Sequence, residues 1–235
     1  MPWQLRDVQP PRPESASART HDSRRHTDEI LQPPGTSRGS DASLGAVASS
    51  APTNIVTQPL TPQLWAAFAD LIDQGGPAGR CWCIAPQIGS AYRRRPPADN
   101  RDDFHRVVKD GPPPGLLALR GGVAVGWCRV SPRAAVPAVE QSWRTRQVDE
   151  VPVWLITCFY VRKGHRRQGI MSALISAAVD LARSAGAPAI EAYPLDGTVS
   201  PSATSTRYAS TFAAAGFTEI ARRSPERPIM RLPLT

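Results

Sequence analysis

A buried strand, a basic loop bounded by two glycines and an amphipathic helix follow one another along residues 153–185. The segment 153–161 is almost wholly apolar and rich in β-branched and aromatic residues, which is typical of a central strand buried on both faces. Gly164 and Gly169 bound the loop, which is rich in arginine. Apolar residues then recur at helical spacing over 170–185. This order places the start of a helix directly after a buried strand.

The junction between the strand and the helix is a candidate anion site. Backbone N–H groups exposed at a helix start and the helix dipole together attract negative charge. Gly164 and Gly169 allow the backbone to approach a phosphate closely, and His165, Arg166 and Arg167 add donors. Each charge-assisted hydrogen bond contributes about 1.5 to 3 kcal/mol, so about four of them hold a pyrophosphate against competition from water.

Two familiar nucleotide motifs do not fit this junction. Gly164 and Gly169 have the glycine spacing of a P-loop, but Ile170 and Met171 follow where Lys and Ser or Thr are needed for the γ-phosphate and Mg²⁺. The glycine fingerprint of dinucleotide-binding folds, G-x-G-x-x-G after a strand, is also missing here. A nucleoside triphosphatase and a Rossmann-type enzyme are therefore disfavoured.

The rest of the chain alternates strands and helices around this unit. Capping by Thr61 with Pro62 at the first helical position predicts a helix over 61–73, and Gly121-Gly122 predicts a hairpin turn. The other expected elements are a loop over 77–97, a helix over 99–109, strands over 116–120 and 123–130, a polar connection over 132–150, a strand over 189–193, a helix over 206–215, and strands over 217–222 and 229–234. We expect an α/β or α+β fold with a mixed sheet and a single core.

The first 55 residues differ from the rest of the chain in composition. Pro, Ser, Arg and Asp dominate them, and their apolar residues follow no helical or strand period, so we expect a disordered tail over 1–55 and one folded domain over 56–235. The tail has no apolar run typical of a secretory signal, and its six acids argue against a transit peptide. No apolar run reaches the roughly 18 residues of a membrane span, so we expect a soluble, cytoplasmic protein.

The basic excess lies outside that tail. The chain has 28 basic and 20 acidic side chains, a net charge of +8, and the first 55 residues hold six of each sign. Only Lys109 and Lys163 are lysines, and arginine is a permanent, forked donor suited to phosphate. Nucleic acid, an anionic lipid surface and a phosphorylated small molecule all match such a charge.

Four cysteines lack the paired spacing of a zinc site or of a small disulfide scaffold. Cys128 and Cys158 fall in apolar strands, where cysteine acts as a small hydrophobic residue. Cys81 and Cys83 flank Trp82 in a loop rich in Gly and Pro, and a metal or redox role for them stays open. We expect reduced thiols and no bound metal.

The strand, loop and helix together resemble the GNAT superfamily of acyl-CoA-dependent N-acyltransferases. The acyl-CoA motif of that family reads R/Q-x-x-G-x-G/A, and residues 166–171 here read Arg-Arg-Gln-Gly-Ile-Met. The arginine and the first glycine match, while Met171 replaces the small final residue. Ala215-Gly216-Phe217 at the end of the next helix is a further match. The resemblance covers residues 57–235 by order of elements and implies a mixed, mostly antiparallel sheet flanked by helices.

The resemblance implies an acetyl-CoA-dependent N-acetyltransferase, in which an amine attacks the thioester directly in a ternary complex. Acetyl-CoA would be a co-substrate, with its pantetheine arm on the main chain of the central strand and its pyrophosphate on the amides of the loop. The residues that we expect to bind it are Phe159, Tyr160, Val161, Gly164, His165, Arg166, Arg167, Gln168, Gly169 and Ile170.

The resemblance specifies the catalytic groups less closely. Members of the family often carry a tyrosine, the acid for the departing thiolate, four residues before the glycine of the Gly-Phe pair, and this chain has Phe212 there. Tyr208, one turn earlier on the same helix face, is our candidate acid. Glu191, expected on the same strand face as Tyr193, is our candidate base. The acids at 149–150 and a chain of water molecules are alternatives for the base.

Two other functions stay open. Phe212 in place of the tyrosine suggests a catalytically silent module that binds or senses acyl-CoA. A pI near 10.0 suggests nucleic-acid binding, which ranks last because the arginines outside 93–95 are dispersed and no base-reading motif is present. The acceptor, a small-molecule or peptide amine, is set by variable loops in this family, and the sequence leaves a homodimer open.

Overall fold

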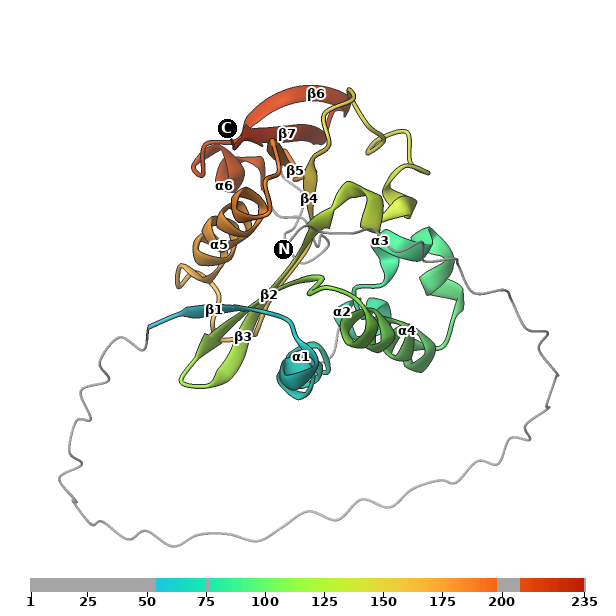
Figure 1. The fold of residues 1–235 in the computed structure, drawn as a ribbon, viewed down its shortest axis with the longest axis vertical. Helices are drawn as coiled ribbons and strands as arrows, with labels where there is room; N and C mark the ends of the chain where they lie inside the picture. The colour runs from blue at the N-terminus through green and yellow to red at the C-terminus, as the bar shows by residue number, and fades with distance from the viewer. Residues whose placement is uncertain (1–53, 75–76, 198–207, 235) are drawn as a thin grey trace, which may run out of the picture. The chain divides into compact units, whose positions relative to one another are not determined.

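The structure is a computed structural model that describes residues 54–74, 77–197 and 208–234. Strands of this part form one seven-stranded sheet in the order β1-β2-β3-β4-β5-β7-β6 (Figure 1). Every neighbouring pair is antiparallel except β4 and β5, which are parallel. The strands are β1 (Val56–Pro59), β2 (Gly115–Arg120), β3 (Val123–Pro132), β4 (Trp154–Val161), β5 (Ala189–Ala192), β6 (Thr218–Ser224) and β7 (Arg227–Pro233). The expected mixed, mostly antiparallel sheet is confirmed.

Helices flank the sheet on both sides. Figure 1 shows α5 and α6 on one side and α1 to α4 on the other. The α-helices are α1 (Trp65–Ile72), α2 (Pro77–Cys81), α3 (Ala85–Ile88), α4 (Pro97–Asp110), α5 (Ile170–Ser184) and α6 (Ala209–Ala213). The 3-10 helices are η1 (Pro62–Leu64), η2 (Gly89–Arg94), η3 (Arg133–Ala135) and η4 (Pro137–Val139).

The prediction of a loop over 77–97 is wrong, because α2, α3 and η2 occupy it. Pro77 and Pro86 stand in the first turns of α2 and α3, where proline fits because its missing N–H has no helical partner there. Between these helices Trp82 and Ile84 are 4% and 3% exposed. Burial of these apolar side chains thus offsets the weak helix propensity of a Gly- and Pro-rich segment.

Strand β1 is absent from the predicted elements. It pairs antiparallel with β2 at the edge of the sheet, from Val56 opposite Leu119 to Pro59 opposite Leu116. Its side chains are mostly exposed, so its four residues show no alternation of apolar and polar types. Pairing with β2 rather than local sequence pattern therefore defines this strand.

The sheet separates two large apolar cores. One lies between α5 and the sheet and contains Phe159, Ile170 and Leu174. The other lies against α1, α2 and α4 and is rich in aromatic residues, with the ring centroids of Phe68 and Trp127 4.9 Å apart; we call it the aromatic core. A third, smaller core packs the η3–η4 segment against β4, β5 and β7.

Close packing fixes the position of α5 on β3. A Cβ added at Gly126 would lie 2.5 Å from Cγ2 of Ile170 and 3.1 Å from Cδ1 of Leu174, so only glycine allows this approach. Ile170 is the first residue of α5. Gly126 therefore sets where the helix begins relative to the sheet. Among the helices of the described residues, none is long and apolar enough to cross a lipid bilayer.

Candidate functional site

The loop between β4 and α5 has a backbone conformation suited to binding an anion. Three of its residues have positive φ: Gly164 at 88°, Arg167 at 60° and Gly169 at 76°. Left-handed residues between right-handed ones turn successive N–H groups toward a common side, which is the geometry of an anion-binding nest. A Cβ added at Gly164 or Gly169 would meet nothing within 4 Å, so packing does not require these glycines. Their backbone conformation and the open space beside them account for the residue type.

The amides of this loop are available to a ligand. His165 donates its N–H to the carbonyl of Arg162, at 3.0 Å. No backbone carbonyl of residues 54–74, 77–197 or 208–234 accepts the N–H of any residue from Arg166 to Ile170. The side chains of Arg166 and Arg167 are exposed at the same loop. The sequence-predicted anion site therefore has donors that can bind an oxyanion without breaking an internal hydrogen bond.

Side chains outside the nest hold the loop in place. Arg162 donates through Nε to the carbonyl of Ala124, at 2.9 Å, and its guanidinium forms an ion pair with Asp70 of α1. Gln168 donates to the carbonyl of Gly164, at 3.0 Å, and accepts a hydrogen bond from Arg120. These bonds join the loop to β3, β2 and α1, so the nest is preorganised by the fold.

Two buried nitrogens at this loop have no hydrogen-bond partner within the described part of the chain. They are Nδ1 of His165 and Nε of Arg120. Buried polar atoms without a partner are rare in folded proteins and carry a free-energy cost unless a ligand or water satisfies them. His165, which the sequence named as a binding residue, is therefore positioned to make a further polar contact.

A β-bulge interrupts β4 directly before the predicted binding residues. Arg129 of β3 pairs with Cys158 of β4, and the next residue, Val130, pairs with Ile156. Thr157 is thus an extra residue in β4 with no partner in β3. Bulges of this kind bend and twist a strand, and they are common next to active sites.

Strands β4 and β5 separate at the same point. Their parallel pairing runs from Trp154 to Ile156 of β4, and the later residues of β4, from Thr157 to Val161, have no paired residue in β5. They remain paired with β3 on their other side. The main chain of Phe159 to Val161 therefore has one edge open to an extended ligand, as the sequence-based interpretation requires.

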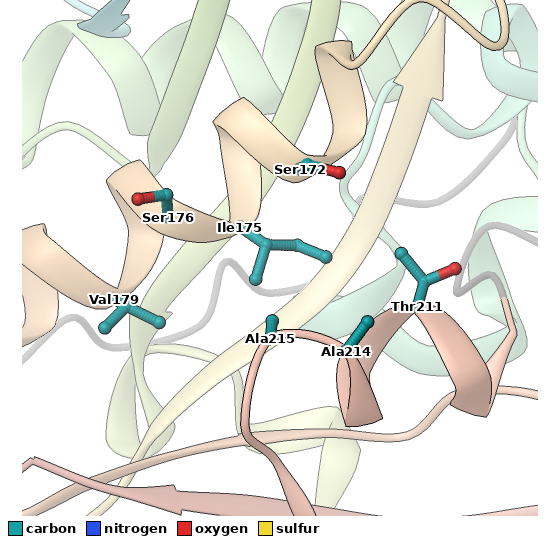
Figure 2. A pocket seen from close by; sticks show the side chains of 7 residues that line it. All are labelled: Ser172, Ile175, Ser176, Val179, Thr211, Ala214 and Ala215. Carbon is teal, nitrogen blue, oxygen red and sulfur yellow. The ribbon is translucent and has the colours of Figure 1, made fainter.

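A cavity of about 310 Å³ lies between α5 and α6 (Figure 2). Residues of α5 from Ser172 to Val179 form one wall, and Thr211 and the two alanines after α6 form the other. Figure 2 shows Ile175 facing Ala214 and Ala215 across the gap. This wall of α5 starts two residues after Ile170, the last residue of the nest. None of these lining residues was among the predicted site residues.

Tyr160, another predicted binding residue, lies on the opposite face of β4 from this cavity. Its side chain packs against the aromatic core of α1 and α4, whereas Phe159 and Val161 are buried in the core of α5. Only the main chain of Tyr160 can take part in a contact shared with Phe159 and Val161.

Glu191, the candidate base, is 1% exposed and lies in a network of charges on β5. Its carboxylate accepts hydrogen bonds from Arg133 at 3.3 Å, from Nε and Nη2 of Arg231 at 2.9 and 2.6 Å, and from the hydroxyl of Tyr193 at 3.3 Å. The expected common face of Glu191 and Tyr193 is confirmed. Burial raises the pKa of Tyr193 above its ordinary value.

The alternative base Asp149 belongs to the same network. It binds both terminal nitrogens of Arg231, at 2.7 and 2.9 Å. This pairing holds the pKa of Asp149 below its ordinary value. A carboxylate stabilised in this way is a weaker base than an unpaired one.

Tyr208, the candidate acid, stands directly before α6 and forms a parallel bridge with Leu195. One turn later Phe212 is 1% exposed, and its ring lies 6.0 Å from that of Phe159 and 5.3 Å from that of Phe217. Phe212 therefore packs between β4 and the chain after α6, at the position where the family often has a tyrosine. The part of the expected helix before Tyr208 lies outside the described residues.

Solved structures are similar to this chain at low sequence identity. An agmatine N-acetyltransferase variant in its apo form has a TM-score of 0.51 and 14% identity, over 77% of this chain and 100% of that one. A polyamine N-acetyltransferase from Drosophila melanogaster has a TM-score of 0.49 and 14% identity, over 77% and 100% of the two chains. A putative acetyltransferase from Salmonella typhimurium, solved with acetyl-CoA, has a TM-score of 0.45 and 19% identity, over 77% and 94%.

Sequence comparison adds a family assignment. A search of curated proteins found no match to the chain. The sequence profile of the acetyltransferase (GNAT) family matches residues 81–207, which is more than half of the 235 residues. The matched region includes β4, the nest and α5, where the sequence motif lies. The chain therefore belongs to the acetyltransferase (GNAT) family.

Proposed function

We propose that the protein transfers an acetyl group from acetyl-CoA to a primary amine, by direct attack of the amine on the thioester in a ternary complex. The observation that carries this proposal is that two sets of backbone groups without hydrogen-bond partners in the described chain follow one another. The free edge of β4 after Thr157 leads directly into the unbonded amides from Arg166 to Ile170. An extended thioester with a pyrophosphate at its far end matches that order of sites.

Each part of acetyl-CoA has a complementary surface in this arrangement. The amides of the nest and the exposed side chains of Arg166 and Arg167 bind the pyrophosphate. The main chain of Phe159 and Val161 binds the amide groups of the pantetheine arm in the manner of an added strand. Nδ1 of His165, which is buried and has no hydrogen-bond partner among the described residues, can donate one more hydrogen bond to the pyrophosphate when it carries the ring proton.

The chemistry needs a close approach of amine and thioester and two proton transfers. Holding the two reactants together lowers the barrier by up to about 7 to 11 kcal/mol. In this proposal Tyr208 protonates the departing thiolate, and Glu191 takes the ammonium proton, directly or through water.

Isothermal titration with acetyl-CoA tests the binding step. Arg166→Ala should weaken binding by about tenfold or more, since a charge-assisted hydrogen bond contributes about 1.5 to 3 kcal/mol. Arg183→Ala is the matched control, because Arg183 lies at the far end of α5 and pairs only with Asp180 among the described residues. Absence of saturable binding by the unaltered protein at millimolar acetyl-CoA would overturn the proposal.

A second candidate function is a catalytically silent module that binds acyl-CoA. The burial of Phe212 favours it, because a phenyl ring stands where the family often has a tyrosine hydroxyl. The two functions differ in turnover. Release of free thiol from acetyl-CoA with any member of a panel of small amines and peptide N-termini establishes the transferase, and tight binding without release across the panel establishes the silent module.

A further inference from the structure

Three thiols and one arginine gather on the face of β4 opposite to the cavity between α5 and α6. Cys158 lies on β4, Cys81 is the last residue of α2, and Cys83 lies in the turn between α2 and α3. The Sγ atoms of Cys83 and Cys158 are 3.7 Å apart, although the two residues are 75 positions apart in sequence. The fold therefore brings together a dithiol that no sequence spacing indicates.

Hydrogen bonds show which of the two sulfurs donates and which accepts. The indole Nε1 of Trp127 donates to Sγ of Cys83, at 3.0 Å. Cys83 in turn donates its S–H to Sγ of Cys158. The hydrogen bond with Cys158 and burial together raise the pKa of Cys83 well above its ordinary value. Cys83 thus keeps its proton. The sulfur of Cys158 accepts the last of these two hydrogen bonds.

Arg129 supplies a buried positive charge beside the two sulfurs. It is 1% exposed, forms no ion pair with an acid of the described chain, and lies opposite Cys158 in the pairing of β3 with β4. Its guanidinium donates to the carbonyl of Cys83 and lies over the ring of Phe104. An unpaired buried cation is costly, and a thiolate at the adjacent sulfurs would compensate it.

Exposure and backbone conformation separate the roles of the two thiols. Cys158 is partly exposed, whereas Cys83 is 2% exposed. Trp82 and Cys83 both have positive φ, at 45° and 59°, which is strained for residues with side chains. Strain of this kind persists only where surrounding contacts impose it, and the hydrogen bonds of the Cys83 sulfur with Trp127 and Cys158 are such contacts.

We propose that Cys158 and Cys83 are a redox modification site, which a peroxide converts into a reversible disulfide. The thiolate of Cys158 attacks the peroxide oxygen, which gives a sulfenic acid on Cys158 and releases hydroxide that takes up the Cys158 proton as water. The sulfur of Cys83 then attacks the sulfenic sulfur and loses its proton, so that an S–S bond forms and a second water leaves. The net reaction consumes two thiols and one hydrogen peroxide and yields one disulfide and two water molecules.

The disulfide would join the α2–α3 turn to β4 next to the bulge at Thr157. This consequence rests on the proposed function, in which β4 holds the thioester along its free edge. A covalent link on the opposite face would restrict the approach of an amine from that side. Reduction by a dithiol reductant would restore the open state.

Peptide mapping of the full chain tests the site without any assay of activity. The reduced protein is exposed to a small excess of hydrogen peroxide, its remaining thiols are alkylated, and it is digested with trypsin without a reductant. Cleavage after arginine gives the peptide 81–93 with Cys81 and Cys83, and the peptide 147–162 with Cys158. We expect these two peptides to be linked to each other.

Variants identify the sulfurs that take part. Cys81→Ala should keep the link, and this variant is needed because Cys81 and Cys83 lie in the same tryptic peptide. Cys128→Ala should also keep it, because Cys128 is buried in the core of α5. Cys83→Ala should abolish the link and leave Cys158 to oxidise further to the sulfinic acid.

Three results would overturn the site: no linked peptide in the unaltered protein, an undiminished link in Cys83→Ala, or loss of the link in Cys81→Ala. Acetyl-CoA titration before and after oxidation is a separate readout. Failure of acetyl-CoA to bind in either state would contradict the proposed function and would leave the mapping result unaffected.

Discussion

At the scale of single residues, Glu191 shows which contacts the alternation of side chains along a strand can predict and which it cannot. Period-two alternation places Glu191 and Tyr193 on one face of a strand, and the hydrogen bond between them confirms it. The same pattern says nothing of Arg133 and Arg231, which come from η3 and β7 and surround the carboxylate. Contacts between residues so far apart in the chain depend on the order of strands in the sheet.

Glu191→Gln should lower the free energy of unfolding by about 3 kcal/mol or more. The substitution removes the shared partner of two arginines whose side chains are only 10% and 14% exposed, and a broken buried pair leaves uncompensated charge. Urea denaturation measures the change. The matched control is Glu219→Gln, which removes an exposed partner of Arg222 and should cost less than about 1 kcal/mol. Equal small losses in both variants would show that the buried network adds little.

Cys81 gives the protein a sensitivity to alkaline pH. Burial raises the pKa of its thiol from 9.0 to about 11, so the folded state binds the proton more tightly than the unfolded state. The contribution to stability is complete below pH 9 and is lost as the pH rises from 9 to about 11. Two pKa units correspond to about 2 to 3 kcal/mol.

Urea midpoints measured under reducing conditions across that interval test this prediction. Cys83, Cys128 and Tyr193 also have raised pKa values, so the unaltered protein should lose stability with several groups acting together. The difference between the unaltered protein and Cys81→Ala isolates the one thiol. If the urea midpoints of Cys81→Ala and of the unaltered protein fell in parallel between pH 9 and about 11, Cys81 would make no such contribution.

At the scale of elements, the sequence locates the site better than it describes its geometry. Apolar composition predicts a strand over 153–161, and the structure has β4 at Trp154–Val161. The bulge at Thr157 depends on the register with β3 and leaves no local signal. Likewise, the glycines at 164 and 169 predict a loop that can adopt positive φ. The positive φ of Arg167, which completes the nest, depends on how the loop connects the end of β4 to the start of α5.

The contact between α5 and β3 should control the nest. Gly126→Ala places a methyl group 2.5 Å from Cγ2 of Ile170, and overpacking of this kind costs about 1 to 3 kcal/mol. Because Ile170 begins α5, the displaced helix start should also weaken binding of acetyl-CoA. A double-mutant cycle with Ile170→Ala measures the effect, since removal of the isoleucine side chain relieves the clash.

The close contact fixes the expected sign of the coupling energy in that double-mutant cycle. Gly126→Ala should cost less stability in the Ile170→Ala background than in the unaltered protein. Thermal melts give the stabilities, and titration gives the affinities. Strict additivity of the two substitutions would show that the close contact places no constraint on the helix.

At the scale of the whole molecule, net charge says less about partners than the count suggests. The excess of +8 includes arginines that the fold itself uses. Arg222 pairs with Asp196 and Glu219, and Arg223 donates to the carbonyls of residues 143, 146 and 147. The loop before α5 is different, because Arg166 and Arg167 are exposed beside unbonded amides. Only the three-dimensional structure separates these two groups of arginines, and composition cannot.

The division of the chain at residue 55 leads to a prediction about folding of the whole molecule. All three apolar cores are built from residues between Ile55 and Leu234. We therefore propose that residues 54–235 fold as one unit without the preceding segment. A chain that starts at residue 54 should melt within about 2 °C of the full chain, which corresponds to less than about 1 kcal/mol, and should bind acetyl-CoA with the same affinity.

A second truncation that starts at residue 61 is the matched control. It removes β1 and also Leu60, which is 0% exposed and donates its N–H to the carbonyl of Gly115, at 2.8 Å. Burial of a leucine side chain alone stabilises a fold by about 1.5 to 3 kcal/mol, so this chain should melt clearly below the longer one. Equal melting temperatures of the two truncated chains would contradict a role for β1. A large drop already at residue 54 would place part of the folding unit before Ile55.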